Sequence, residues 1–208
     1  HPGERAGRFG QASAEGDDAF WAFVRSQFVL DPEWSYLNVG GLGACPLPVL
    51  NMVSECSRAE ERAPSAGHDA KAWDLVKVKL ARLLGKECRK EDLALISTAT
   101  EGISLIVNGL SLKSGDEVIT SSHEHAALYT ALLNRAQRDG IVIRVFDPDI
   151  TSGSGNVNRI AGLTNARTRL IFISHVSCTT GQRFPAKDIA ALARAKGIWF
   201  ALDGAQAP

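Results

Sequence analysis

The sequence predicts an α/β protein with a mostly parallel sheet flanked by helices. Beyond Gly85, short apolar runs typical of buried strands alternate with segments whose apolar residues recur at helical spacing. Strands that alternate with helices build βαβ units, and these cover both faces of a parallel sheet. A chain of 208 residues, 45% of them hydrophobic, is large enough to bury the core of such a domain.

The part of the chain before Gly85 follows a different pattern. Residues 1–16 are polar and rich in Gly and Ala, so we expect them to be disordered or loosely held. Helical spacing predicts helices over residues 20–28 and 68–84, and the stretch "LNVGGLGACPLP" between them predicts a loop. We expect residues 1–33 to form a tail and a helix, and residues 34–208 to form the first part of one large domain.

The elements beyond Gly85 follow in order along the chain. Strands are predicted over residues 93–97, 117–120, 141–146, 170–174 and 198–202. Helices are predicted over residues 101–110, 125–138, 159–163 and 186–196, the third of them short and preceded by a Gly/Ser/Asn-rich loop. In the second of these helices, Leu128, Leu132 and Ala136 fall on one face, which predicts that this face packs on the sheet.

Four polar segments follow four of the five predicted strands. They are "STATEG", "SSHEH", "SHVSCTTG" and "DGAQ", after the first, second, fourth and fifth strands. In open parallel sheets, ligands bind just beyond the carboxyl ends of the strands. We therefore expect these segments to converge at one edge of the sheet, where the Asp203 carboxylate needs a cationic or hydrogen-bonding partner.

Each polar segment has more than one physical interpretation. The helix start near Thr100 has the features of an anion site, because unpaired backbone N–H groups and the helix dipole point outward there; the simpler interpretation is an ordinary helix cap, and the two roles are compatible. His125 opens a helix, where a histidine is commonly solvated or capping. His123 and His125 are two residues apart without a third ligand nearby, so no metal site is expected. Asp203 has the position of a helix cap as well as that of a ligand contact.

The composition excludes several classes of protein. Lys and Arg together number 23, as do Asp and Glu, and the basic residues are scattered, so no nucleic acid or anionic membrane is expected as a partner. No apolar stretch approaches the roughly 18 residues of a membrane span. The four cysteines form no C-x-x-C pair, which indicates a reducing, cytoplasmic compartment; an exported chain would carry no trace of a removed signal peptide. "GLGACP" does not follow a strand and no Walker loop occurs, which argues against a nucleotide-binding protein.

Taken together, the motifs resemble the class V aminotransferase superfamily of pyridoxal-phosphate enzymes, which have fold type I. "TATEG", "EH" and "DGAQ", in this order and spacing, carry the resemblance. "LNVGGLGACPLPV" and "SHVSCTTGQRFP" are especially similar to the branch of isopenicillin N epimerase-like proteins. The resemblance runs from about Trp34 to the last residue, and it implies pyridoxal 5'-phosphate as the cofactor.

The resemblance also implies roles for five residues. Ala99 and Thr100 would hold the cofactor phosphate, and His125 would lie flat on the pyridine ring. Asp203 would keep the ring nitrogen protonated through a charge-assisted hydrogen bond, and Gln206 would reach the phenolic oxygen of the cofactor. His125 and Asp203 are therefore the expected catalytic residues, and all five are expected cofactor contacts.

Cys178 and the missing lysine mark departures from the family pattern. Cysteine desulfurase-like members commonly carry Asn where Cys178 aligns, which favours the epimerase-like branch; we expect Cys178 to pack as an ordinary cysteine without a catalytic role. Family members bind the cofactor through a lysine in a Ser-x-His-Lys-like segment downstream of "DGAQ", and residues 1–208 contain no such segment. We therefore expect this chain to be the N-terminal part of a longer enzyme and to be inactive alone.

The resemblance finally implies a function for the parent protein. It would be a homodimer that acts on an amino acid or amine by transamination, epimerisation or C–S or Cβ elimination, with residues 38–46 approaching the neighbour's site. The alternative is a noncatalytic dimerising or ligand-binding module that is derived from the same fold and lacks the lysine.

Overall fold

The computed structural model describes residues 18–64 and 70–207. The segment expected to be loosely held, residues 1–16, lies outside the described residues. The chain divides into two compact units that meet in sequence between Leu93 and Ala94, and each is described here by itself. The boundary expected between residues 33 and 34 stays a prediction. No helix in the described ranges has the length and apolar character needed to cross a membrane.

The first unit is helical. Its elements are α2 (Asp18–Ser26), α3 (Leu47–Arg62), α4 (Ala70–Leu84) and the short 3-10 helix η2 (Lys90–Asp92). The helices predicted over residues 20–28 and 68–84 correspond to α2 and α4, and the proposed start at residue 68 lies outside the described residues. The Gly-rich stretch is a loop up to residue 45, as predicted.

Helix α3 was missed because the prolines at its start were interpreted as part of the loop. Pro46 is the N-cap residue and Pro48 lies in the first turn. Proline fits there, because the first N–H groups of a helix have no partner within the helix and the proline ring fixes a helical φ.

The second unit is a parallel four-stranded sheet with helices on both faces, which confirms the predicted fold class. The strands are β1 (Glu117–Ser121), β2 (Val142–Phe146), β3 (Thr168–Ser174) and β4 (Trp199–Asp203), in the order β2-β1-β3-β4. The helices are α5 (Ala99–Gly109), α6 (Ala126–Asp139), α7 (Gly153–Leu163) and α8 (Ala186–Ala195).

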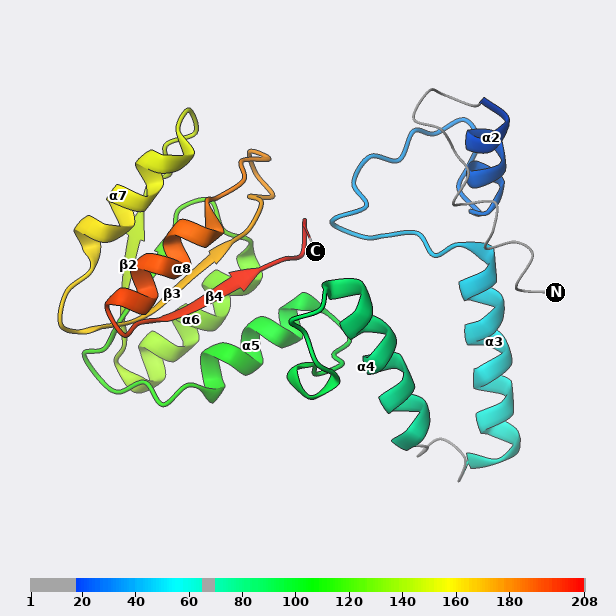
Figure 1. The fold of residues 1–208 in the computed structure, drawn as a ribbon, viewed down its shortest axis with the longest axis horizontal. Coiled ribbons are helices and arrows are strands. Elements are labelled where there is room, and N and C mark those ends of the chain that lie inside the picture. The colour runs from blue at the N-terminus through cyan, green and yellow to red at the C-terminus, as the bar shows by residue number, and fades with distance from the viewer. Residues whose placement is uncertain (1–17, 65–69, 208) are drawn as a thin grey trace. The chain divides into compact units, whose positions relative to one another are not determined.

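Alternation along the strands divides the core between the two faces. Val118, Leu170 and Phe172 pack in one buried cluster with side chains of α5 and α6. Their neighbours Ile119 and Ile171 point the other way, into a second cluster with α7 and α8. Figure 1 shows these two helix pairs on opposite sides of the sheet. Because both faces of the central strands β1 and β3 are covered, each contains a run of buried apolar residues, which is why the sequence predicted them.

Two predictions for this unit were wrong. Residues 93–97 do not form a strand, because no described residue pairs with them and a strand requires a hydrogen-bonded neighbour. Helix α7 is longer than expected, because it begins at Gly153 within the predicted loop. The Ser152 hydroxyl accepts from the Gly155 N–H and caps this start, and the buried Asn156 amide donates to the Asp149 carbonyl.

A buried arginine joins α6 to the end of α5. The Arg135 side chain donates to four backbone carbonyls that lie close together in the sequence, at the end of α5 and just beyond it. They are those of Val107, Asn108, Leu110 and Leu112, at 2.9–3.2 Å. Arg135 also pairs with Asp139 on its own helix. The last carbonyls of a helix lack partners within the helix, so this guanidinium satisfies the carboxyl end of α5.

Candidate functional site

Three of the four polar segments meet at the carboxyl edge of the sheet. Ser174, at the end of β3, is in register with Asp203 at the end of β4, and the His175 N–H donates to the Asp203 carbonyl at 2.8 Å. The Glu124 carboxylate, from the segment after β1, accepts from the Ser174 N–H at 2.8 Å and from its hydroxyl at 2.6 Å. The predicted convergence is therefore observed directly for "SSHEH", "SHVSCTTG" and "DGAQ".

Asp203 ends β4 and is 8% exposed. Its Oδ1 accepts from the Ala205 N–H at 2.9 Å, in a turn that the Ala207 N–H closes on the Gly204 carbonyl. Asp203 therefore caps a turn rather than a helix. Among the described residues, no donor contacts its second oxygen, Oδ2, so half of a mostly buried carboxylate has no protein partner.

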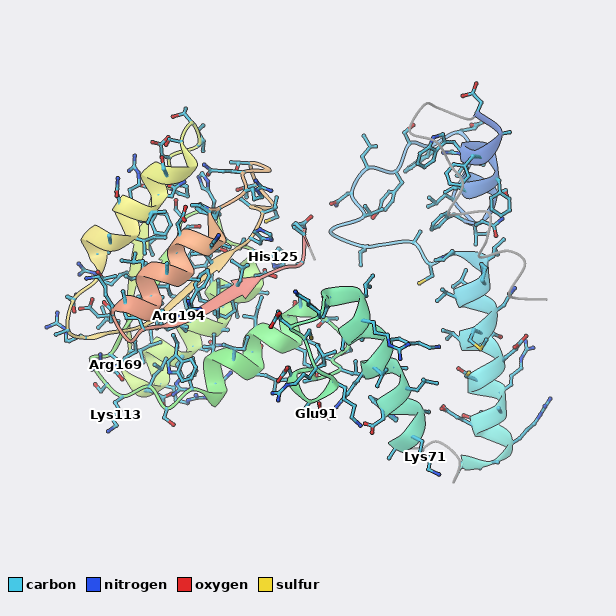
Figure 2. All side chains as sticks on the ribbon, viewed as in Figure 1. Lys71, Glu91, Lys113, His125, Arg169 and Arg194 are labelled. Atoms are coloured by element: carbon cyan, nitrogen blue, oxygen red, sulfur yellow. The ribbon has the colours of Figure 1, made fainter. Side chains whose placement is uncertain are left out.

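His125 occupies the N-cap position of α6. Its Nδ1 accepts from the Ala127 N–H at 3.2 Å, which confirms the capping interpretation. Figure 2 shows His125 at the end of the sheet toward which β4 points, whereas Lys113 and Arg169 lie at the opposite end. The stacking role implied by the family resemblance stays a prediction. No group of three His, Cys, Asp or Glu side chains in the described ranges has a metal-binding arrangement.

Ala99 and Thr100 are the first two residues of α5. The cap itself is Thr98, whose hydroxyl accepts from the Glu101 N–H, and Glu101 accepts in turn from the Ser97 N–H at 2.8 Å. Within the described part of the chain, the N–H groups of Ala99 and Thr100 donate to no acceptor. Thr100 also lines a cavity of about 330 Å³ with Ala127, two residues after His125. The start of α5 thus presents two backbone N–H groups that have no acceptor among the described residues, and their expected contact with a phosphate stays a prediction.

Gln206 lies three residues beyond Asp203, in the turn after β4. It is exposed, and it makes no hydrogen bond to another described residue. Its expected contact with the phenolic oxygen of the cofactor stays a prediction.

Glu124 is the residue of this edge that sequence reasoning missed. It is 6% exposed and accepts hydrogen bonds from the Ser121 and Ser174 hydroxyls. Burial raises the pKa of the Glu124 carboxyl, the hydrogen bonds from Ser121 and Ser174 oppose this rise, and the negative charge of Asp203 adds to it. Two acidic side chains thus lie close enough at this edge to influence each other. The signal in the sequence was an acid three residues after the end of a strand, between two histidines.

The loop after β3 is tied to the segment after β1 as well. The buried Ser177 hydroxyl donates to the His123 carbonyl at 3.3 Å, and Val176 forms an isolated antiparallel bridge with Arg183. Cys178 follows on this loop and is exposed, so it does not pack in the interior of the described residues, and its expected lack of a catalytic role stays a prediction. The buried position at this point of the loop belongs to Ser177, because its side chain points back toward the edge.

Comparison with protein families gives one match over most of the chain. The model described as aminotransferase class-V matches residues 50–208. Among curated proteins, the isopenicillin N epimerase of Amycolatopsis lactamdurans is 32% identical over 199 residues, which cover 90% of this chain and 48% of that protein. The cysteine desulfurase of Salmonella newport is 37% identical over 120 residues, covering 56% of this chain and 29% of that protein. The chain thus spans about half the length of the epimerases that it matches.

Solved structures share the fold. A mutant of C-DES, with glycine covalently linked to its PLP cofactor, superposes with a TM-score of 0.74 at 22% identity, over 88% of this chain and 49% of that one. The cysteine desulfurase CsdA from Escherichia coli gives a TM-score of 0.73 at 22% identity, over 89% of this chain and 48% of that one. At this level of identity the superpositions establish the fold.

Proposed function

The chain belongs to the class V aminotransferase family, and we propose that its protein is a pyridoxal-phosphate-dependent enzyme that acts on an amino acid or amine. The observation that carries the proposal is the junction of three polar segments at the carboxyl edge, around a mostly buried Asp203. Parallel sheets bind their ligands at this edge. The alternative of a noncatalytic module is not favoured, because the matching relatives are named as enzymes.

The residues at this edge fit the chemistry of pyridoxal phosphate. An anionic phosphate needs donors, and the N–H groups of Ala99 and Thr100 lack an acceptor at a helix start whose dipole favours negative charge. A protonated ring nitrogen needs a buried carboxylate, and the free Oδ2 of Asp203 provides one. His125 supplies a flat ring at the start of α6, at the end of the sheet toward which β4 points, and the exposed Gln206 is free to turn toward a ligand.

When bound here, pyridoxal phosphate would supply an electron sink for the substrate. The Asp203 carboxylate would hold the proton on the ring nitrogen and so strengthen that sink. Nδ1 of His125 is engaged with the Ala127 N–H, so only Nε2 of its ring remains to exchange a proton. The apolar cores on both faces of the sheet keep these side chains on a rigid support.

The finer proposal is an epimerisation, with transamination and C–S or Cβ elimination as the other reactions open to this scaffold. Similarity to isopenicillin N epimerases extends over 90% of the chain, whereas similarity to the cysteine desulfurase covers 56%. The exposed Cys178 stands where the desulfurase-like pattern has an amide donor, and a thiol is a poor replacement for it. The four cysteines are unpaired, which supports a cytoplasmic location.

We also propose that the enzyme is a homodimer in which residues 38–46 approach the partner's site. Val39 is 61% exposed and Leu42 is 81% exposed in this segment, and burying apolar side chains of this size under a partner stabilises the assembly. Sedimentation of the full-length protein over a range of concentrations tests this. A monomer that stays fully active on dilution contradicts it.

The proposed function is tested by adding pyridoxal phosphate to the full-length protein, freed of any cofactor beforehand. We expect a new visible absorption band at stoichiometric cofactor, and racemisation or loss of the α-proton of a bound amino acid, followed by isotope exchange from solvent. A protein that folds normally but produces no such band with the cofactor lacks the proposed function.

Two substitutions of His125 separate its capping role from stacking. His125→Asn keeps an N-cap side chain but removes the ring, and His125→Phe keeps a ring but removes the acceptor for the Ala127 N–H. We expect His125→Asn to retain stability and weaken cofactor binding, and His125→Phe to lose about 1 kcal/mol of stability while it binds the cofactor better than the Asn variant. Thermal melts and cofactor titrations measure both effects. The opposite order of cofactor affinities would leave His125 as a cap alone.

A further inference from the structure

We propose that Glu124 is the positioning residue of the cofactor site: through its hydrogen bonds to Ser121 and Ser174 it sets where His125 and Asp203 stand. This inference rests on the proposed function and adds to it a residue that touches neither the cofactor nor the substrate. The proposal follows from the hydrogen bonds of the Glu124 carboxylate and from the positions of its two partners, Ser121 and Ser174, at the ends of β1 and β3.

Three donors converge on the two oxygens of Glu124. The Ser121 hydroxyl donates to Oε1, and the Ser174 N–H and hydroxyl donate to Oε2 at 2.8 Å and 2.6 Å. Ser121 ends β1 and Ser174 ends β3, so one side chain joins the carboxyl ends of two adjacent strands. Beyond this point the strand ladder stops, and the Glu124 side chain joins the two segments together with the hydrogen bond from the Ser177 hydroxyl to the His123 carbonyl.

One end of the link leads to His125. Glu124 is the residue directly before it, and the His125 backbone has the extended N-cap conformation, with φ −67° and ψ 147°. Holding the Glu124 side chain against β3 therefore fixes the point at which α6 begins. The direction of the His125 ring depends on that point, because the ring is also held by the Ala127 N–H.

The other end of the link leads to Asp203. Ser174 is in register with Asp203, and the next residue, His175, donates its N–H to the Asp203 carbonyl at 2.8 Å. The end of β4 therefore follows the position of Ser174. A shift of the Glu124 side chain is transmitted to both proposed cofactor contacts, which lie on segments almost eighty residues apart in the sequence.

Stability alone does not favour a carboxylate at the position of Glu124. A buried carboxylate loses its hydration, and here it also faces the negative charge of Asp203. Tyr129 is within the electrostatic reach of the same carboxylate, and its hydroxyl donates to the Ser121 carbonyl. An apolar residue could fill the space between the strands, but only an acceptor with two oxygens satisfies the Ser174 N–H and both hydroxyls together.

The chain offers a matched control in Glu117, at the other end of the same strand. Glu117 is 1% exposed and accepts from the Arg167 guanidinium at 2.8 Å and from the Asn165 amide at 2.7 Å. It too links β1 to residues near the start of β3, but at the amino edge of the sheet. Unlike Glu124, it is ion-paired, with Arg167 and Arg144, but removing it also perturbs a buried carboxylate on β1 and leaves the carboxyl edge untouched.

The test compares Glu124→Ala, Glu124→Gln and Glu117→Ala in the full-length protein. Fluorescence titration gives the affinity for pyridoxal phosphate, and circular dichroism of the bound cofactor reports the asymmetry of its surroundings. We expect Glu124→Ala to weaken the affinity by roughly tenfold or more and to change the cofactor's dichroic band. The amide oxygen of Glu124→Gln still accepts from both Ser174 donors, so this variant should recover most of the affinity and the band. Glu117→Ala should lower the melting temperature and leave both cofactor readouts unchanged.

The outcomes separate this inference from the proposed function. If the unmodified protein binds no pyridoxal phosphate, the proposed function falls, and this inference falls with it. If the unmodified protein binds the cofactor and Glu124→Ala matches it in affinity and dichroism, or changes them no more than Glu117→Ala does, only the positioning role is overturned. Should Glu124→Ala fail to fold, Ser174→Ala takes its place: it removes one donor to Oε2, and we expect a smaller change in the same direction, whereas an unchanged band overturns the proposal.

Discussion

Replacing Asp203 by Asn in the full-length protein is expected to leave pyridoxal phosphate bound while lowering kcat/KM by at least about ten- to a hundredfold. The side-chain oxygen of Asn can still accept from the Ala205 N–H, so the turn after β4 should survive. The phosphate contacts proposed for Ala99 and Thr100 lie on another segment and are not altered. What is lost is the negative charge that would hold a proton on the ring nitrogen. A charge-assisted hydrogen bond contributes roughly 1.5–3 kcal/mol, which corresponds to the stated loss in rate.

Steady-state kinetics and the cofactor's absorption spectrum, recorded on the same preparation, measure this effect. Asp116→Asn is the matched control, since Asp116 is also mostly buried, pairs with Arg169 at 3.3 Å and precedes β1 at the opposite edge. We expect the control to show normal turnover. An Asp203→Asn variant that turns over at the normal rate would mean that Asp203 only caps its turn.

Removal of the Asp203 charge has a second consequence at Glu124. The negative charge of Asp203 is one cause of the raised pKa of the Glu124 carboxyl, although burial is the larger cause. In Asp203→Asn the pKa of Glu124 should therefore move down toward its ordinary value. The substitution removes none of the donors to Glu124, so its hydrogen bonds to Ser121 and Ser174 stay available and the loss of activity reports on Asp203 itself.

The central strands β1 and β3 could be predicted from sequence because both of their faces are buried. Their buried apolar residues, Val118 and Ile119 in β1 and residues 170–173 in β3, appear in the sequence as short runs between turn signals. The helices on the two faces were predictable for a related reason, since their apolar stripes recur at helical spacing. Local composition was sufficient to predict a strand or helix wherever that element packs through its own apolar residues.

Elements that depend on distant partners could not be predicted in this way. Residues 93–97 have the composition of a strand, but a strand exists only where another backbone lies beside it, and no described residue does so here. The start of α7 has the composition of a loop, and it is helical because Ser152 caps it and Asn156 bonds to Asp149. Both errors concern interactions that composition does not encode.

The candidate site shows the same division. The placement of Asp203 and Ser174 at one edge followed from the parallel topology, which a pattern of alternating strands and helices already implies. The burial of Glu124 did not follow, because it depends on hydrogen bonds to Ser174, fifty residues later in the chain. The amides of Ala99 and Thr100 were placed correctly at a helix start, but the cap proved to be Thr98.

Replacing the buried Arg135 by Met is expected to lower the free energy of unfolding by about 3–5 kcal/mol. Met fills much of the volume of the arginine stem but cannot donate. The carbonyls of Val107, Asn108 and Leu110, at the carboxyl end of α5, would then lose their donors in a region that water does not reach freely. Asp139 would also lose a partner on its own helix.

Urea unfolding followed by circular dichroism of the full-length protein measures the change, with Arg138→Met as the control. Arg138 lies three residues away on α6 and binds the same Asp139, but its side chain is 60% exposed. Exposed ion pairs contribute little, so we expect this control to change the free energy of unfolding by at most about 1 kcal/mol. Two variants with equal effects would show that the charge near Asp139 matters and the four carbonyls do not. A large effect of Arg135→Met alone would mean that this guanidinium holds α5 and α6 together. The first of these helices begins with the proposed phosphate contacts, and His125 caps the start of the second.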